Sequence, residues 1–489
     1  MHTTPERQSL HIISTGDIHG ALLPVDFLRD APATSSLAHV AGYVAQLRRS
    51  EGSHNLLMLD CGDMLQGGPA AYYFNYLHDA SQPHPVAQMM CHIGYDAMTI
   101  GNHDIETGHG VFDRFKRDLH PAPLLGANVT DISGSPYFTP YALFERGGRR
   151  VAVIGLTTEA VAEWVPRQAR KGLRVGAMVD AARRWVDYVR AHHHPDLIVG
   201  LFHSGYEPSP TITSTLPENL SARIACEVPG FDLIVMGHDH RKAIRRTDSG
   251  TLLVDSGAYA SHLVDVTVGA DGTLTAELVD LRSVTPDTEF IDRFAPLGRK
   301  VADYVGRPIG YADRSYCSDE TLGEVSPFMR VIHRAQLRAS GASVSLAAPV
   351  SLGVTIGPGT LTVADLYRFY RFDNGLCVMQ LTVGELRRYL AYSRRLLNRY
   401  RAGEKVPAYD LDTAMGRLPD DDADDGEIVD VTLNTYRACG GGGHLTLGAG
   451  IEPSDLDGRI VRTLPGTLRD AIEELFTLPS CGPREGKLS

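Results

Sequence analysis

The sequence predicts an α/β protein of two domains, in which a layered α/β domain is followed by a smaller α+β domain. With 489 residues, the chain is too long for one ordinary hydrophobic core. Short apolar runs alternate with amphipathic helical patterns over residues 1–285, which is typical of layered α/β domains. The pattern changes after a long amphipathic stretch, 288–306, that ends before Pro308. We therefore predict a first domain at 1–287, a linking helix at 288–306 and a second domain at 307–489.

Apolar runs predict the strands of the first domain, and apolar spacings of three to four residues predict its helices. The strands are expected at residues 10–15, 55–60, 96–100, 151–157, 196–202, 231–236, 251–255 and 263–268. Helices are expected at 37–50 and 177–191, and Asp271-Gly272 predicts a hairpin turn between two late strands.

The second domain is predicted to contain several short helices with strands pairing between them. The helices are expected at 326–339, 363–370, 382–400 and 466–477, and the strands near 344–348, 376–381 and 428–434.

Composition excludes several classes of partner. A net charge of -12 and a pI near 5.9 argue against a nucleic-acid polymer or an anionic membrane, because both require a basic surface. Seven scattered cysteines without a CxxC pair indicate free thiols in a reducing compartment. No signal-peptide pattern precedes residue 10, and no apolar run approaches the ~20 residues of a membrane span. As given, the chain is expected to be cytoplasmic, or periplasmic or secreted if a leader has been removed. The oligomeric state is not predicted.

Polar side chains follow the ends of five predicted strands. They are Asp17 and His19, Asp60 and Asp63, Asn102 and His103, His203, and His238 and His240. Sites in α/β sheets form beyond the carboxyl ends of the strands, where the loops converge. This set has more ligands than one tetrahedral ion uses, so it suits two divalent ions sharing a bridging carboxylate. Mn, Zn, Fe, Co or Ni would each accept such ligands.

This set of motifs resembles the calcineurin-like metallophosphoesterases. Its order and spacing match the branch in which that domain precedes a 5'-nucleotidase carboxyl-terminal domain. The resemblance implies a four-layer αββα sandwich with a smaller α+β nucleotidase domain. Members of the branch are 5'-nucleotidases, UDP-sugar hydrolases or 2',3'-cyclic-nucleotide 2'-phosphodiesterases.

The resemblance also implies a role for each candidate residue of the first domain. One metal ion would be held by Asp17, His19, Asp63 and His240, and the other by Asp63, Asn102, His203 and His238. Asp63 would be the bridge, with Asp60 as the alternative. His103 resembles the family's catalytic histidine, which stabilises charge on the transferring phosphoryl group or its leaving oxygen. Glu106 occupies the position of its carboxylate partner, which is often Asp in the nucleotidases.

Substrate contacts are expected in the second domain. An aromatic residue on each of two loops could sandwich a nucleobase. The resemblance implies Phe372 and Tyr436 as this pair and Asn374 as a reader of the base edge. The chain departs from many 5'-nucleotidases at Gly442, where they have an Asp that contacts the ribose, and at Thr355, where they have Arg. Arg437 resembles the cyclic phosphodiesterases, and either a ligand contact or a structural salt bridge is open to it.

The predicted function is hydrolysis of nucleotide phosphoesters by water that two divalent ions activate to hydroxide. The substrate is a small nucleotide, and the prediction leans toward 2',3'-cyclic or 3'-phosphates over 5'-phosphates. The alternatives are hydrolysis of UDP-sugars or other diphosphates, and nucleotide binding without turnover.

Overall fold

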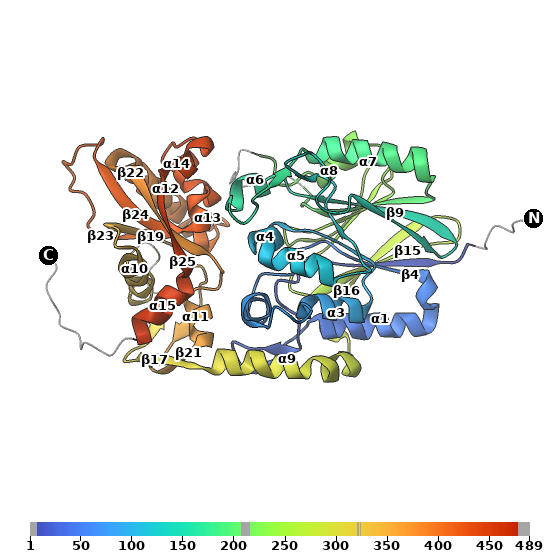
Figure 1. Ribbon diagram of the computed structural model, residues 1–489, viewed down its shortest axis with the longest axis horizontal. Helices are drawn as coiled ribbons and strands as arrows, with labels where there is room; N and C mark the ends of the chain where they lie inside the picture. Colours follow the sequence, from blue (N-terminus) through green and yellow to red (C-terminus); the bar gives the residue numbers. More distant parts are fainter. Residues whose placement is uncertain (1–6, 207–215, 320–321, 323, 478–489) are drawn as a thin grey trace, which may run out of the picture. The chain divides into compact units, whose positions relative to one another are not determined.

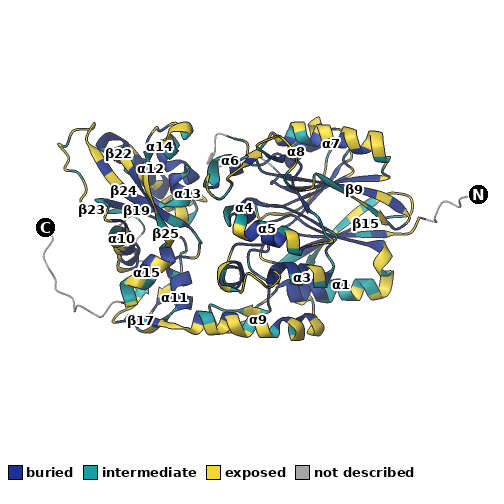
Figure 2. Ribbon diagram, in the orientation of Figure 1, coloured by how far each residue is buried: buried dark blue, intermediate teal, exposed yellow. Residues whose placement is uncertain are grey.

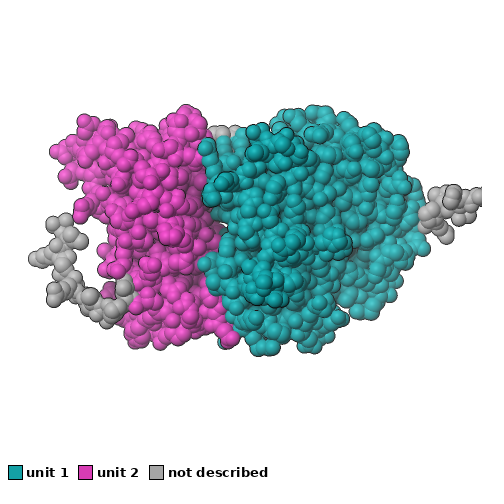
Figure 3. Space-filling view, in the orientation of Figure 1, with its two compact units in different colours: residues 1–301 teal, residues 302–489 magenta. Residues whose placement is uncertain are grey.

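The computed structural model describes residues 7–206, 216–319, 322 and 324–477. Its packing divides the chain into two compact units, residues 1–301 and residues 302–489 (Figure 3). Each unit has its own sheets and its own core, and each is described separately below.

The first unit contains two six-stranded sheets. One has the order β16 (Leu274–Asp280), β15 (His262–Val268), β1 (Leu10–Thr15), β4 (Leu56–Asp60), β5 (Ala97–Thr99) and β6 (Leu124–Leu125). The other has the order β13 (Lys242–Arg246), β14 (Leu252–Ser256), β12 (Leu233–Met236), β11 (Leu197–His203), β9 (Arg149–Thr157) and β8 (Tyr141–Arg146).

The two sheets pack face to face, because one buried apolar core takes side chains from both. Leu59 and Val266 come from the first sheet, and Leu201 and Val235 come from the second. Helices α7 (Met178–His193) and α8 (Ser221–Glu227) cover the outer face of the second sheet through a separate core. Helices α1 (Leu37–Glu51), α3 (Pro85–Ile93) and α5 (His109–Asp118) lie on the outer side of the first sheet (Figure 1). The predicted αββα sandwich is confirmed.

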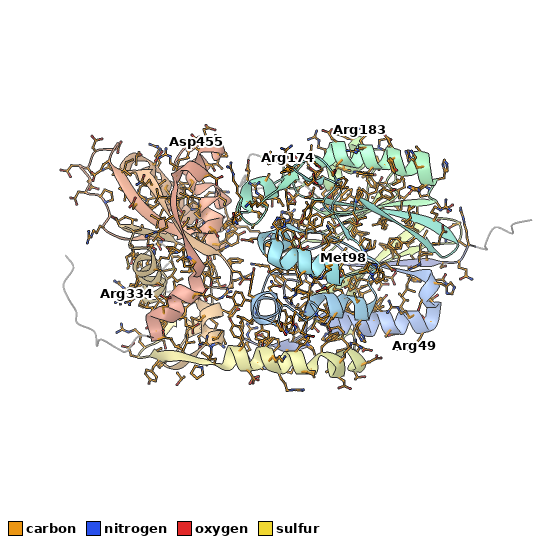
Figure 4. The ribbon with its side chains drawn as sticks, viewed as in Figure 1. Arg49, Met98, Arg174, Arg183, Arg334 and Asp455 are labelled. Carbon is orange, nitrogen blue, oxygen red and sulfur yellow. The ribbon has the colours of Figure 1, made fainter. Side chains whose placement is uncertain are left out.

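Burial follows these layers. Residues of the central strands are almost all buried, whereas the outer helices expose one face (Figure 2). Arg49 on α1 and Arg183 on α7 are exposed, and Met98 on β5 lies inside the sandwich (Figure 4).

The position of each strand in its sheet explains whether the sequence predicted it. Strands β1, β4, β5 and β6 run parallel, as do β9, β11, β12 and β14, and most of their residues are buried on both faces. Such strands read as continuous apolar runs. Edge strands β8 and β13 were not predicted, because half or more of their residues are partly or fully exposed and their apolar signal is weak.

The second unit is built on a five-stranded sheet. Its order is β23 (Thr413–Gly416), β19 (Val344–Ala347), β24 (Ile428–Asn434), β22 (Gly375–Thr382) and β25 (Ile460–Thr467). The predicted helices are present as α10 (Pro327–Ser340), α11 (Val363–Phe369), α12 (Val383–Arg401) and α15 (Leu468–Thr477). The α+β class is confirmed. Strand β25 was missed because most of it is exposed.

Helix α9 (Thr288–Gly306) runs through the division between the two units. The domain limits at 287 and 307 stay predictions. All described cysteines are free thiols, and Cys481 lies outside the described residues. Among the described helices, none combines the length and the apolar character needed to cross a membrane.

Candidate metal centre

Five strand ends of the first unit supply the predicted ligands. Asp17 and His19 follow β1, Asp63 follows β4, and His238 and His240 follow β12. Asn102 begins α4 shortly after β5, and His203 is the last residue of β11. Because these strands are parallel within each sheet, their carboxyl ends lie at one edge of the sandwich. The fold therefore brings together all seven predicted metal ligands.

Asp17, His19 and His240 form the first group of ligands. His19 Nε2 lies 3.0 Å from His240 Nε2 and 3.8 Å from Asp17 Oδ1. His240 Nε2 is 3.6 Å from the same Asp17 oxygen. This oxygen is fully buried and has no hydrogen-bond partner among the described residues. A buried carboxylate oxygen facing two imidazole nitrogens fits a divalent cation, since a cation would compensate the buried charge.

Asp63, His203 and His238 form the second group. His203 Nε2 lies 3.2 Å from Asp63 Oδ2 and 3.3 Å from His238 Nδ1. Asn102 Oδ1 is 2.9 Å from the same His203 nitrogen. Two imidazoles, a carboxylate and an amide oxygen therefore converge, which is a donor set suited to a second divalent ion.

Asp63 lies between the two groups. Its Oδ2 is 3.2 Å from His203 Nε2 in the second group and 3.7 Å from His19 Nε2 in the first. Asp60, the alternative bridge, has both oxygens engaged elsewhere: the Thr15 hydroxyl donates to one at 2.6 Å and the Gly62 amide to the other at 2.8 Å. The geometry therefore favours Asp63 as the shared ligand.

Backbone carbonyls orient two of the histidines. His19 Nδ1 donates to Gln66 O at 3.0 Å, and His203 Nδ1 donates to Cys61 O at 2.7 Å. A carbonyl can only accept, so both rings carry a proton on Nδ1, which leaves Nε2 as the atom that can bind a metal ion. This arrangement is typical of metal-ligating histidines.

The charges at the centre favour a cation. Burial lowers the pKa of His19 to about 3 and that of His240 to about 4, so both rings are neutral and able to bind metal at neutral pH. Burial raises the pKa of Asp17 to about 8. Although burial opposes a charge on His203, the Asp63 carboxylate raises its pKa to about 10. Metal ligands bind in their deprotonated forms, so divalent ions would displace these protons.

Five of the seven ligands have a left-handed backbone. Asp17, His19, Asp63, His238 and His240 have φ angles between 44° and 82°. Non-glycine residues rarely adopt this region, at a cost of order 1–3 kcal/mol each. The surrounding structure must therefore hold these residues in place, and such strain is concentrated at functional sites.

Asp104 holds the loop that carries Asp63, a role that the sequence analysis missed. Its carboxylate accepts hydrogen bonds from the amides of Asp63, Met64, Leu65 and Gly101 at 2.8–2.9 Å. It lies in the same short motif as Asn102 and His103. A carboxylate at the third helical position of α4 (Asn102–Glu106) is the signal that could have revealed it.

His103 and Glu106 form the predicted pair. His103 Nδ1 lies 2.8 Å from Glu106 Oε2 across one turn of α4. The His103 ring is 31% exposed and lies 5.5 Å, centroid to centroid, from the His19 ring. Burial opposes a charge on His103, but Asp63 and Glu106 raise its pKa to about 9. The ring therefore carries a positive charge beside the first group of ligands.

Arg437 has a structural environment in the second unit. The side chain is 3% exposed, and its guanidinium donates to Asp412 Oδ1 at 2.8 Å and Asp410 Oδ1 at 3.3 Å. It also donates to Tyr409 O at 2.6 Å and Gly441 O at 2.5 Å. Of the two roles open to Arg437, these contacts support the salt bridge, because the protein engages the guanidinium on both terminal nitrogens.

The ion pairs of Arg437 also occupy the space beside Gly442. A methyl group at this position would fall on Arg437 Nη1 and on Asp410 Oδ1, and the residue has a φ of 71°. No side chain fits here while Arg437 keeps its partners.

Arg437 joins the loops that carry two aromatic residues, the exposed Tyr409 and the partly buried Tyr436. It binds the carbonyl of Tyr409, and it follows Tyr436 in the chain. The Tyr436 ring lies against Gly441, where a methyl group would meet the ring atoms. The Tyr409 ring is 6.3 Å from Phe372, at 80° to it. Tyr409 was not predicted from the sequence, because no aromatic pattern marks its loop.

Asn374 is buried, and its Oδ1 accepts a hydrogen bond from the Tyr370 hydroxyl at 2.9 Å. Thr355 lies on the short strand β20 (Thr355–Ile356) and is exposed. The substrate roles of Phe372, Asn374 and Tyr436 stay predictions.

Comparison with known proteins identifies the family. Residues 10–242 match the calcineurin-like phosphoesterases, and residues 308–411 match the 5'-nucleotidase C-terminal domain. The chain therefore combines a calcineurin-like phosphoesterase domain with a 5'-nucleotidase C-terminal domain, as the motifs indicated. Calcineurin-like phosphoesterases use a dimetal centre.

Two curated relatives and one solved structure illustrate the similarity. The 2',3'-cyclic-nucleotide 2'-phosphodiesterase/3'-nucleotidase of Yersinia enterocolitica is 25% identical over 461 residues, covering 81% of this chain and 69% of the relative. The trifunctional nucleotide phosphoesterase YfkN of Bacillus subtilis is 24% identical over 552 residues, covering 92% of this chain but 37% of the relative. The structure of a 5'-nucleotidase precursor from Thermus thermophilus shares the fold, with a TM-score of 0.68, 20% identity and coverage of 96% of this chain and 97% of that one.

Replacing Gly101 by Ala is expected to weaken metal binding. A methyl group at Gly101 would lie 2.6 Å from the amide nitrogen and 2.8 Å from Cγ of Asp63, so the carboxylate would have to move. We expect the affinity for divalent ions to fall by about 10–100-fold, as for other changes that disorient metal ligands. Equilibrium dialysis followed by elemental analysis measures it. Gly110→Ala is the matched control, because a methyl group there meets nothing within 4 Å. Equal metal affinity in both variants would contradict this account.

Replacing Gly442 by Ala is expected to destabilise the second unit by about 3–5 kcal/mol, because the methyl group would break the buried Arg437 ion pairs. Gly450 also has a left-handed backbone, with a φ of 80°, but open space around it. Gly450→Ala should therefore cost only the backbone strain, about 1–2 kcal/mol. Urea unfolding of the full chain measures both. Similar losses in the two variants would show that Arg437 does not fill the space at Gly442.

Proposed function

We propose that the protein is a dimetal phosphoesterase that hydrolyses small nucleotides. The observation that carries this proposal is the Asp63 carboxylate between two groups of ligands, with the His103–Glu106 pair beside them. Membership of the calcineurin-like phosphoesterases supports it.

In hydrolysis, some residues of the first unit would bind the metal ions and others would contact the phosphoryl group. Asp17, His19, Asp63 and His240 would hold one divalent ion, and Asp63, Asn102, His203 and His238 the other. Such a pair of ions supplies an activated water and neutralises the charge on the phosphoryl oxygens. His103 would donate a hydrogen bond from Nε2 to a phosphoryl or leaving-group oxygen, because Glu106 occupies Nδ1. Its positive charge suits that task.

The second unit would bind the base. Aromatic side chains contribute roughly 1–3 kcal/mol per stacked base. Tyr436, Phe372 and Tyr409 are candidates, and Tyr409 and Tyr436 lie on loops that Arg437 joins. Arg437 would then act by holding these loops and not by touching the phosphate.

We further propose that 2',3'-cyclic and 3'-nucleotides are the preferred substrates. The Yersinia relative named for these activities covers 81% of this chain. Gly442 also supports this choice, because it removes the acidic side chain with which many 5'-nucleotidases contact the ribose.

Metal-dependent turnover tests the proposal directly. Metal-stripped protein would be reconstituted with Mn²⁺ or Zn²⁺ and offered 2',3'-cAMP, 3'-AMP, 5'-AMP and UDP-glucose. We expect phosphate or nucleoside release from the first two only when metal is restored. Asp63→Asn should reduce kcat by at least ~100-fold, because it removes the shared charge on which both ions depend.

Asp248→Asn is the control, since it removes the same charge at an exposed turn. A preference for 5'-AMP would refute the substrate assignment while leaving the dimetal mechanism in place. Metal binding without turnover of any of the four compounds would refute the proposed function.

A further inference from the structure

One histidine of the second group, His238, is oriented differently from the other ligating histidines. Backbone carbonyls bind the Nδ1 atoms of His19 and His203, so these rings offer Nε2. His238 is reversed: its Nε2 lies 3.1 Å from Glu218 Oε1, and its Nδ1 faces His203 Nε2 at 3.3 Å. Glu218 is not among the predicted ligands, and the proposed function assigns it no role.

Glu218 determines which nitrogen of His238 is available. An ionised carboxylate can only accept a hydrogen bond, so His238 Nε2 carries the proton. The lone pair then resides on Nδ1, the nitrogen that faces His203 and the second group of ligands. A carboxylate behind a ligating imidazole also raises its strength as a ligand.

The backbone of Glu218 is anchored to the strand that carries His203. Its carbonyl accepts from the hydroxyls of Thr158 at 2.8 Å and Ser204 at 3.0 Å. Ser204 Oγ in turn accepts from Leu220 N at 2.9 Å, and Gly205 N donates to Asn219 Oδ1 at 2.7 Å. These hydrogen bonds hold the backbone of Glu218 beside His203, so the side chain extends toward His238 from a fixed Cα.

The His238 ring is held on a second side by Trp164. Their ring centroids are 5.8 Å apart with an interplanar angle of 21°, so the indole stacks on the imidazole. Stacking fixes the plane of the ring but permits a 180° flip about the Cβ–Cγ bond. Such a flip would put Cδ2 and Cε1 where Nδ1 and Nε2 lie, and the hydrogen bond from Nε2 to Glu218 selects the orientation in which Nδ1 faces the second group.

From these contacts we propose that Glu218 is a positioning residue for the second metal site: it holds His238 so that Nδ1 is the ligand. The inference rests on the proposed dimetal function. It assigns Glu218 to one ion only, because the Glu218 carboxylate contacts His238 of the second group, whereas His19 of the first group is oriented by Gln66 O. Loss of Glu218 should weaken binding of the ion at Asp63, Asn102, His203 and His238 and spare the other.

The test is a metal titration of the full chain with Mn²⁺, followed by elemental analysis and electron paramagnetic resonance. Wild-type protein should bind two ions and give the spectrum of a spin-coupled pair. Glu218→Ala should bind one ion with unchanged affinity and the other about 10–100-fold more weakly. Its spectrum at limiting Mn²⁺ should be that of an isolated ion. His238→Ala should lose the same ion, which identifies the site.

Two further variants separate positioning from a loss of folding. Glu218→Gln keeps a hydrogen-bond acceptor without the charge, so it should restore part of the affinity for the weakened ion. Glu277→Gln removes the same charge from an exposed position of strand β16 and should bind two ions as the wild type does.

Three results would overturn the inference. They are unchanged binding of both ions in Glu218→Ala, equal weakening of both ions, and a Gln variant no better than the Ala variant. The first of these, with turnover intact, would leave the proposed function standing. Failure of the wild-type protein to bind two ions would overturn both proposals.

Discussion

The structure of the first unit depends on the position of one carboxylate, that of Asp63. Its Oδ2 faces imidazoles of both ligand groups, and its Oδ1 accepts from the His103 amide at 2.9 Å. Asp63 is buried with a left-handed backbone, so it requires outside support. Asp104 supplies this support through the surrounding amides, and Gly101 leaves the space that the carboxylate occupies. Two glycine-containing loops from neighbouring strands therefore hold the shared ligand.

The sandwich accounts for how such strain persists. The strained residues lie in the short loops directly after buried parallel strands, and the core between the two sheets fixes where those strands end. The carboxyl ends of these strands converge as a result, and the ligand atoms within each group lie within 4.8 Å of one another. Interior packing of this kind is stiff, so the energetic cost of a left-handed backbone at the loops is met by contacts elsewhere.

The central strands and the ligand set were predictable because both have local signals. A buried parallel strand is an apolar run, and Asp17, His19, Asn102 and His103 follow such runs directly. Edge strands β8 and β13 have no such run. The partners of Arg437 were beyond reach, because Asp410 and Asp412 precede it by 27 and 25 residues with no periodic pattern between them. The contact of Glu218 with His238 could not be predicted either, because it depends on where strands β11 and β12 place His203 and His238.

Anomalous scattering from crystals of the Mn²⁺-loaded protein would show whether Asp63 bridges two metal ions. Data collected at the manganese edge locate each ion independently of the protein atoms. We expect two peaks about 3.5–4 Å apart, as in other two-metal sites, both within bonding distance of Asp63. One peak should lie near His19 and His240 and the other near His203 and His238. A single peak, or two peaks that do not share Asp63, would contradict the bridging role of Asp63.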